Sequence, residues 1–339
     1  MFIKNCWYVA AWEHELLDER LLQRTILNES ILFFRTSDGQ VVALDNKCCH
    51  RHAPLSLGRR EGDCIRCMYH GLKYDRHGKC VEIPGQTAIP RQMRVRSYPV
   101  VQSKRWVWIW MGDPAKADAA LIPDTFSLQH PDWRMKPGYL QFQANHLLIS
   151  DNLLDFSHLS YVHEGTLGGS LDIAQTRPTM ERLERGVRVR REMSKITPAP
   201  YHQRLAQFSG PVDRWFVYDY LIPGVLLMES GVRPADLRLR EREKTLNFHS
   251  CQALTPETAT ATHYFFASAH QSWLEEGATD HIYQSVLSAF AEDRRMIEAQ
   301  QQLISSTAAA DMLPLLGDAA LGQFRLLMQR ALEAENPQT

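Results

Sequence analysis

Two short cysteine–histidine segments decide the fold of this chain: Cys48-Cys-His-Arg-His-Ala-Pro-Leu55 and Cys67-Met-Tyr-His-Gly-Leu72. The first segment contains a Cys-x-His pair and the second a Cys-x-x-His pair, and sixteen residues separate the two pairs. Pro54 and Gly71 stand where tight turns would bring the four side chains together. Thiolates and imidazoles in such a mixed set bind either iron–sulfur clusters or zinc. The spacing therefore predicts a metal centre that is carried on two loops.

The two kinds of metal centre differ in the spacing that they use. In a Rieske two-iron, two-sulfur centre, two cysteines hold one iron and two histidines hold the other. A structural zinc site of two cysteines and two histidines usually places two to four residues between its first two ligands. Only one residue stands between Cys48 and His50. This spacing favours the iron–sulfur centre over the zinc site.

The cysteine count and the overall composition limit the class of protein. Seven cysteines are present, and five of them lie between positions 48 and 80, which indicates metal binding rather than a disulfide framework. The N-terminus has no apolar segment of signal-peptide length, and no apolar run approaches the roughly 20 residues of a membrane helix. We therefore expect a cytoplasmic protein. The net charge of −1 argues against nucleic-acid binding.

The pattern along the 339 residues predicts two domains of different composition. Residues 1–115 contain short apolar runs between turn signals, and the alternating tryptophans of Arg105-Trp-Val-Trp-Ile-Trp110 predict a buried strand that fills a core. In residues 116–339, strand-like stretches precede long helical patterns at 278–305 and 318–334. We expect an α+β protein: an N-terminal all-β domain, then an α+β domain with an antiparallel sheet and helices, in a helix-grip-like arrangement.

A second polar constellation is Asp151-Asn-Leu-Leu-Asp155-Phe-Ser-His158-Leu-Ser-Tyr-Val-His163. On one continuous helix, Asp151, Asp155 and His158 would share a face within about 60°. A solvated helix face is the alternative to a metal site. His158 and His163 would differ by about 140°, so both reach one metal only if the helix bends, tightens or ends between them.

A third ligand for such a metal is expected from the helical pattern at 278–305. Non-haem Fe(II) oxygenases bind iron with two histidines and one carboxylate. Asp293 lies in the apolar stripe of this helix, within about 80° of its neighbours, whereas Glu292 and Glu298 lie outside it. The neighbours on the stripe are Ile282, Val286, Phe290 and Ile297. A buried carboxylate is costly without a partner, and a bound metal accounts for it.

These motifs resemble those of the Rieske oxygenase family, and the resemblance extends over nearly the whole chain. Asn152-x-x-Asp155-x-x-His158-x4-His163 looks like the iron-binding motif of that family. Asn5-Cys-Trp-Tyr-Val-Ala10 and Glu82-Ile-Pro-Gly85 look like the branch that contains the vanillate and dicamba O-demethylases and the toluenesulfonate methyl-monooxygenases. Cys49 departs from the pattern, since relatives commonly have Pro there, and we expect it to be no ligand.

The resemblance implies two metal cofactors. Cys48, His50, Cys67 and His70 would hold a 2Fe–2S cluster, and His158, His163 and Asp293 would hold a mononuclear Fe(II). Residues 1–115 would thus form the Rieske domain and residues 116–339 the catalytic domain.

Two further residues receive roles from the same resemblance. Asp155 would link a Rieske histidine of a neighbouring subunit to His158, inside a head-to-tail homotrimer. Asn152 would lie beside the iron without firmly ligating it. Asp151 is an extra acid to which the pattern gives no role.

The implied reaction is the O₂-dependent hydroxylation of a methyl or methoxy group on a small aromatic acid. A separate NAD(P)H-dependent reductase or ferredoxin would supply electrons, since no nucleotide-binding fingerprint is present. The alternatives are an N-dealkylating Rieske oxygenase and a non-catalytic Rieske electron carrier. Candidate pocket residues are Met228, Gln252, His249 and Tyr283, and an anionic substrate would need an Arg or a His beside it.

Overall fold

The structure is a computed structural model that describes residues 1–17, 19–168, 170–236, 245–308 and 312–335. Two compact units divide the chain, Met1–Pro123 with Thr255–Ala259 and Asp124–Leu254 with Thr260–Thr339. The expected boundary at 115/116 falls in a short 3-10 helix, η3 (Pro114–Lys116). In the described ranges, every helix is too short or too polar to cross a lipid bilayer. The α+β class, with β structure first, is confirmed.

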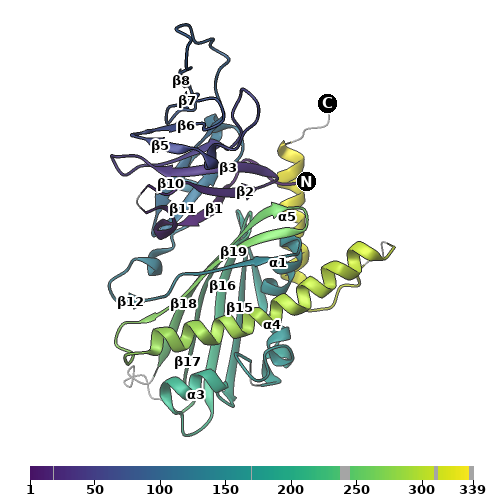
Figure 1. The fold of residues 1–339 in the computed structure, drawn as a ribbon. Helices are drawn as coiled ribbons and strands as arrows, with labels where there is room; N and C mark the ends of the chain where they lie inside the picture. Colours follow the sequence, from purple (N-terminus) through teal and green to yellow (C-terminus); the bar gives the residue numbers. More distant parts are fainter. Residues whose placement is uncertain (18, 169, 237–244, 309–311, 336–339) are drawn as a thin grey trace. The chain divides into compact units, whose positions relative to one another are not determined.

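The first unit is built from three small antiparallel sheets, with strand orders β1-β11-β10, β2-β3-β4-β9 and β5-β6-β7-β8 (Figure 1). The strands are β1 (Trp7–Trp12), β2 (Leu22–Ile26), β3 (Glu29–Arg35), β4 (Val41–Asp45), β5 (Arg59–Glu61), β6 (Cys64–Arg66), β7 (Lys73–Tyr74), β8 (Cys80–Glu82), β9 (Ser97–Tyr98), β10 (Val100–Ser103) and β11 (Trp106–Trp110). Two short 3-10 helices, η1 (Glu13–Leu16) and η2 (Leu55–Leu57), lie between strands of this unit, and two more, η3 and η4 (Ala119–Leu121), follow β11.

The tryptophan-rich strand β11 lies in the core of this unit, as its alternation predicts. It pairs with β1 on one side and β10 on the other, and all five of its residues are buried. The rings of Trp106 and Trp110 each lie 5.4 Å from a tryptophan of β1, Trp12 and Trp7 respectively. These rings therefore fill the core and form no binding face.

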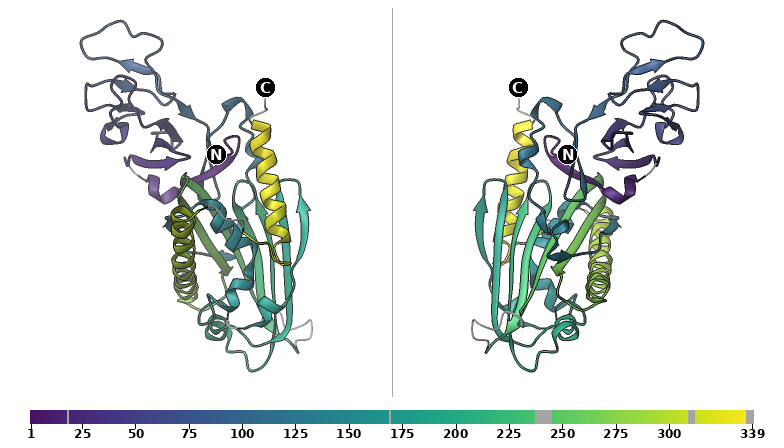
Figure 2. Two further views of the ribbon diagram at one scale, coloured as in Figure 1. Left: turned by 90° about the vertical axis from the view of Figure 1, so that its right-hand side faces the viewer. Right: turned by 90° about the vertical axis from the view of Figure 1, so that its left-hand side faces the viewer.

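The second unit is an eight-stranded antiparallel sheet with helices packed on it (Figures 1 and 2). The strand order is β12-β19-β18-β17-β16-β15-β14, and β13 also pairs with β19. The strands are β12 (Trp133–Arg134), β13 (Gly138–Phe142), β14 (Thr179–Leu183), β15 (Gly186–Ile196), β16 (Val212–Leu221), β17 (Val225–Pro234), β18 (Leu246–Thr258) and β19 (Ala261–Gln271). The helices are η5 (Phe126–Leu128), α1 (His146–Leu154), η6 (Phe156–Ser160), α2 (Asp172–Gln175), α3 (Pro200–Ala206), α4 (Ala278–Ser306) and α5 (Ala319–Glu335).

The two predicted long helices are observed as α4 and α5, and both pack on one face of the sheet. Tyr264 of β19 stacks on Phe290 of α4, with ring centroids 5.0 Å apart. Tyr220 of β16 meets Phe324 of α5 at 4.7 Å. Helix α1 packs against both helices. The second constellation, in α1, η6 and the residues that follow η6, lies over this face of the sheet, where Phe156 stacks on Tyr218 of β16.

The long hairpin of β18 and β19 ends in a segment that belongs to the first unit. Thr255 Oγ1 donates to the backbone oxygen of Val9, at 2.7 Å. The backbone N–H groups of Leu27 and Asn28 donate to the oxygens of Pro256 and Glu257, both at 2.9 Å. The first unit is therefore discontinuous in sequence.

Candidate metal centres and substrate cavity

The two cysteine–histidine loops have the same backbone design. One follows β4 and the other joins β6 to β7. Each is closed by a hydrogen bond to the oxygen of its cysteine, from His52 N to Cys48 and from Gly71 N to Cys67, both at 2.9 Å. The two donors share a left-handed conformation, with φ +57° for His52 and +76° for Gly71. A Cβ at position 71 would come within 2.7 Å of Pro84, so that site also needs glycine for space.

The four predicted cluster ligands gather at the tips of these loops. Cys48 and Cys67 are buried, and His50 and His70 are exposed, with their rings 4.5 Å apart. This arrangement fits a two-iron cluster whose thiolate-bound iron lies inside and whose imidazole-bound iron faces solvent. An exposed imidazole edge suits electron exchange with another protein surface.

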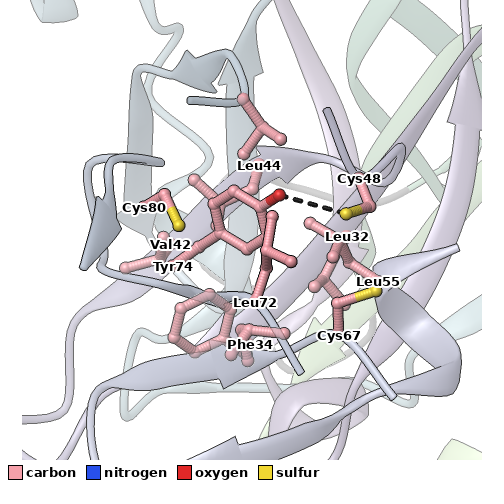
Figure 3. Packing of buried hydrophobic residues seen from close by; sticks show 12 residues of the cluster. Leu32, Phe34, Val42, Leu44, Cys48, Leu55, Cys67, Leu72, Tyr74 and Cys80 are labelled. Carbon is pink, nitrogen blue, oxygen red and sulfur yellow. Dashed lines mark hydrogen bonds between the residues drawn. The ribbon is translucent and has the colours of Figure 1, made fainter. Parts of the chain in front are cut away.

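An apolar cluster lies beneath the loops and contains the phenol of Tyr74 (Figure 3). Its hydroxyl lies 3.0 Å from Cys48 Sγ and 3.2 Å from Cys49 Sγ. Cys49 Sγ is also 4.0 Å from Met93 Sδ. The thiol of Cys49 thus contacts a hydroxyl and a thioether. These contacts are compatible with its expected position outside the ligand set.

The helix that carries the second constellation ends earlier than its periodicity predicts. Helix α1 stops at Leu154, and Asp155 has extended backbone, with φ −127° and ψ 99°. The expectation of one helical face through Asp155 and His158 is wrong, because Asp155 caps the next segment, η6, by accepting from Ser157 N at 2.9 Å. The helical segment does end between the two histidines, as their common reach to one metal requires, because η6 stops at Ser160, and the ring of His158 lies 5.2 Å from that of His163.

His158, His163 and Asp293 come together, although Asp293 lies on the distant helix α4. Their candidate ligand atoms all lie within 4.8 Å of one another. Asp293 Oδ1 is 3.1 Å from His163 Nε2 and 3.6 Å from His158 Nε2. Asn152 Nδ2 donates to the same oxygen at 2.9 Å. Two imidazoles and one largely buried carboxylate thus converge on one position, and this set of side chains fits the ligands of non-haem iron.

The other nitrogen of each imidazole is held by a hydrogen bond. His158 Nδ1 lies 2.6 Å from the backbone oxygen of Asp155, and His163 Nδ1 lies 2.7 Å from Glu292 Oε2. These acceptors favour the tautomer with hydrogen on Nδ1, which leaves Nε2 free for a metal. Thr166 Oγ1 also donates to Glu292, at 2.9 Å. Sequence reasoning missed Glu292 because it lies outside the apolar stripe.

The pKa values of the two histidines are shifted in opposite directions. Burial lowers the pKa of His158, which keeps that ring neutral. Burial acts in the same direction on His163, but the carboxylates of Asp293 and Glu292 outweigh it, so the pKa of His163 is raised. Without a metal the buried carboxylate of Asp293 and the half-buried carboxylate of Glu292 thus attract a proton to His163, and a cation bound at Nε2 would take over that charge compensation.

The surroundings of Asp155 differ in one respect from what the resemblance implies. His158 donates to the backbone oxygen of Asp155 and not to its carboxylate. The carboxylate accepts from Ser157 and lies 3.5 Å from Arg191. Its side chain keeps 28% exposure, so it has a face open to a further donor. Asp151, the extra acid, forms an ion pair with Arg325 of α5.

Comparison with known families agrees with both centres. Residues 6–99 match the Rieske [2Fe-2S] domain, and residues 142–334 match the vanillate O-demethylase oxygenase C-terminal domain. The chain belongs to the Rieske non-haem iron monooxygenases. The match at residues 142–334 is a second domain that a simple Rieske electron carrier would not need. The match at residues 6–99 identifies the two loops as those of an iron–sulfur cluster rather than of a structural zinc site.

Relatives of this Rieske oxygenase match along its whole length. The iron–sulfur subunit of the toluene-4-sulfonate monooxygenase system of Comamonas testosteroni is 47% identical, over 99% of both chains. The oxygenase component of dicamba O-demethylase of Stenotrophomonas maltophilia is 35% identical, over 93% of both. The crystal structure of dicamba monooxygenase bound to 3,6-dichlorosalicylic acid has a TM-score of 0.90 at 30% identity and 99% coverage of both chains. The expected membership and fold are confirmed.

The metal site of this Rieske oxygenase opens into a cavity over the inner face of the sheet. Besides the three metal-site residues it is lined by Asn152, Leu153, Phe156, Leu159, Leu167, Tyr201, Arg214, Phe216, Met228, Ser230, Phe248, Ser250, Gln252, Ser268, Ile282, Val286 and Phe290. The candidates Met228 and Gln252 are in this lining. His249 instead lies 4.4 Å from the ring of Trp133, and Tyr283 stacks on Phe266, so neither reaches the described lining.

Proposed function

We propose that this chain is the terminal oxygenase of a multi-component system that hydroxylates a methyl or methoxy group of a small aromatic acid. One observation carries the proposal: the pair of histidines and the carboxylate lie in the wall of a mainly apolar, aromatic-lined cavity. Such a cavity suits a flat apolar ring, and the ligand set leaves positions of the metal open. When bound, the iron supplies the chemistry of O₂ activation.

The protein's own residues position the substrate and exclude water. Phe216, Phe248 and Phe290 line the cavity from two strands and from α4, and each can pack against an aromatic ring. Besides the metal-site residues, the polar side chains of the lining are Asn152, Tyr201, Arg214, Gln252 and three serines, Ser230, Ser250 and Ser268. The carboxamide oxygen of Gln252 accepts from Tyr264, which fixes its orientation. The cavity thus holds an apolar substrate body and limits where a polar substituent can lie.

The relatives support the reaction class. Their names attach the same two-domain chain to toluene-4-sulfonate, to dicamba and to vanillate. Two of these systems are O-demethylases, in which a hydroxylated methoxy group collapses to a phenol and formaldehyde. Methyl hydroxylation and O-demethylation are the same oxidation on different substituents, so one site geometry serves both.

Electron delivery involves other protein surfaces. A reductase or ferredoxin supplied by NAD(P)H would reduce the cluster at its exposed histidines, His50 and His70. The Rieske function would reside in residues 1–115 and the mononuclear iron in residues 116–339. A head-to-tail homotrimer would bring a cluster of one subunit to Asp155 of the next, whose carboxylate has an open face.

The test reconstitutes the chain with a reductase and NADH and offers toluene-4-sulfonate, vanillate and dicamba. We expect one of them to yield a hydroxymethyl product or formaldehyde in step with O₂ consumption. Heat-inactivated oxygenase with active reductase is the control. Consumption of NADH without product from any aromatic acid would contradict the proposed reaction. Product from N-alkyl substrates alone would instead identify the reaction as N-dealkylation.

A further inference from the structure

Arg214 of β16 is a buried cation without a carboxylate. Only 2% of its surface is exposed, and among the described residues none of the Asp or Glu side chains forms an ion pair with it. Two other buried arginines of the chain do have such partners: Arg24 pairs with Glu15 at 2.6 Å, and Arg191 lies 3.5 Å from Asp155. A buried charge is costly unless an opposite charge compensates it. The missing counter-charge therefore calls for an explanation.

The hydrogen bonds of Arg214 satisfy only part of its guanidinium. The two terminal nitrogens donate to the backbone oxygens of Gly168 and Leu167, at 3.0 and 2.9 Å. The Nε atom is buried and has no hydrogen-bond partner in the described structure. The guanidinium lies 4.7 Å above the ring of Phe216. Neutral carbonyls and a ring face do not neutralise the charge, and an unused donor remains.

The groups beside Arg214 do not supply negative charge either. Tyr201 and His202 of α3 are its titratable neighbours. Burial raises the pKa of Tyr201 and lowers the pKa of His202 well below its usual 6.5, so both side chains are neutral near pH 7. The positive charge of Arg214 thus stays uncompensated by this part of the protein.

Arg214 lines the same cavity as the metal-site residues. The next inward-facing residue of β16, Phe216, meets Phe156 with ring centroids 5.4 Å apart, and Phe156 lies 6.3 Å from His158. Aromatic side chains therefore connect the buried cation to the metal ligands. A flat ring in this cavity can face the guanidinium with one substituent and the ligand triad with another.

We propose that Arg214 binds the anionic group, a sulfonate or a carboxylate, of the aromatic substrate and so turns its methyl or methoxy group toward His158, His163 and Asp293. This inference rests on the proposed function. A guanidinium binds both anions through parallel N–H donors, and the low dielectric of a buried site strengthens the pairing. The substrate then supplies the counter-charge that the protein lacks.

A purely structural role for Arg214 is the competing explanation. Its two carbonyl contacts hold the loop after His163, where Gly168 is packed so tightly that a Cβ would lie 1.8 Å from the oxygen of Leu159. Loss of Arg214 could therefore loosen the iron site. A structural role predicts equal effects on charged and neutral ligands, whereas anion binding predicts an effect that depends on the ligand's charge.

The experiment compares toluene-4-sulfonate with the neutral toluene-4-sulfonamide, by anaerobic calorimetry on the iron-loaded protein. We expect the wild type to prefer the sulfonate, and Arg214→Gln to weaken sulfonate binding by about 10- to 100-fold while sulfonamide binding changes by less than about threefold. Arg214→Lys, which keeps the charge, should retain most of the preference. Arg188→Gln removes the same charge from a half-exposed ion pair with Asp219, which lies outside the cavity lining, and should leave the preference unchanged.

Two results would overturn the inference: equal binding of both ligands by the wild type, or equal weakening of both by Arg214→Gln. Iron content and the cluster spectrum are measured in each variant. If Arg214→Gln loses iron, Arg214→Lys decides instead. A preference for the sulfonate close to that of the wild type supports the inference, and a lost preference in an iron-loaded Arg214→Lys contradicts it. Binding needs no turnover, so failure of the proposed reaction, seen as absence of product from the wild type, is recorded separately from failure of this inference.

Discussion

The Nδ1 atom of His163 lies 2.7 Å from Glu292 Oε2, on the side of the ring opposite to Asp293. Adjacent residues of α4 thus contact opposite nitrogens of one imidazole, since Asp293 Oδ1 lies 3.1 Å from Nε2. One helix turn both supplies a candidate ligand and fixes the orientation of another. Any shift of α4 would therefore move two of the three ligands together.

Glu292→Gln should weaken the mononuclear iron site without emptying it. The amide oxygen still accepts from His163, but the charge that makes the imidazole a better donor to the metal is lost. We expect iron affinity to fall by about 10- to 100-fold, measured by chelator competition, while the cluster spectrum stays unchanged. Asp293→Ala should lose this iron altogether. Glu298→Gln, on the same helix but bonded to Gln143 N, is the control, and unchanged affinity in Glu292→Gln would contradict the role.

Cys67→Ser or His70→Ala should abolish the visible absorption of the cluster, because each removes one of four ligands. Cys49→Ser should keep it, since the adjacent Cys48 fills the ligand position of that loop. Absorption spectra of the purified variants, normalised to protein, are the measurement. A cluster that survives in Cys67→Ser, or is lost in Cys49→Ser, would mean that the ligand set is different.

Asp155→Asn should keep both metals but slow electron delivery between subunits, because a neutral amide is a weaker acceptor for a partner imidazole. Single-turnover reduction kinetics measure this step. Co-expression of His70→Ala with His158→Ala provides the stronger test. Partial activity in mixed oligomers is expected, since an intact cluster in one subunit can serve an intact iron in the next. Mixed oligomers no more active than either parent would rule out transfer across the interface.

Acid should destabilise the fold through His146, whose pKa burial lowers to about 4. The unfolded state takes up a proton near pH 6.5 and the folded state does not. Stability is therefore full above pH 6.5 and falls between pH 6.5 and 4, by up to about 3 kcal/mol. The free energy of unfolding, measured by urea denaturation across this pH range, should fall more steeply with decreasing pH in the wild type than in His146→Gln. The exposed His77→Gln should follow the wild type, and equal slopes in all three would refute the assignment.

The two loops and the triad were predictable because their signals are local. Ligand spacing marks the loops, and the apolar stripe of α4 marks Asp293. The end of α1 was not predictable from periodicity, since the capping role of Asp155 interrupts a pattern that continues past it. Glu292 was missed because it lies outside that stripe, and nothing in the sequence around it marks His163, 129 residues away, as its partner.

Arg214 is marked by the period-two pattern of its strand. It occupies the same every-second position of β16 as Val212, Phe216 and Tyr218, and that period of two places it on the inner face. The sequence pattern thus predicts that Arg214 faces inward. Its place in the cavity lining depends on how the sheet packs against α3 and α4.

The discontinuity of the first unit sets the limits within which the chain can be recombined. A fragment that stops at Pro123 would lack Thr255–Ala259, and the N–H groups of Leu27 and Asn28 would lose the acceptors that the hairpin tip provides. Exchange of Rieske modules between relatives must therefore graft this short loop along with the N-terminal segment. Chimaeras joined at a single crossover should fold less well than those with the matched tip.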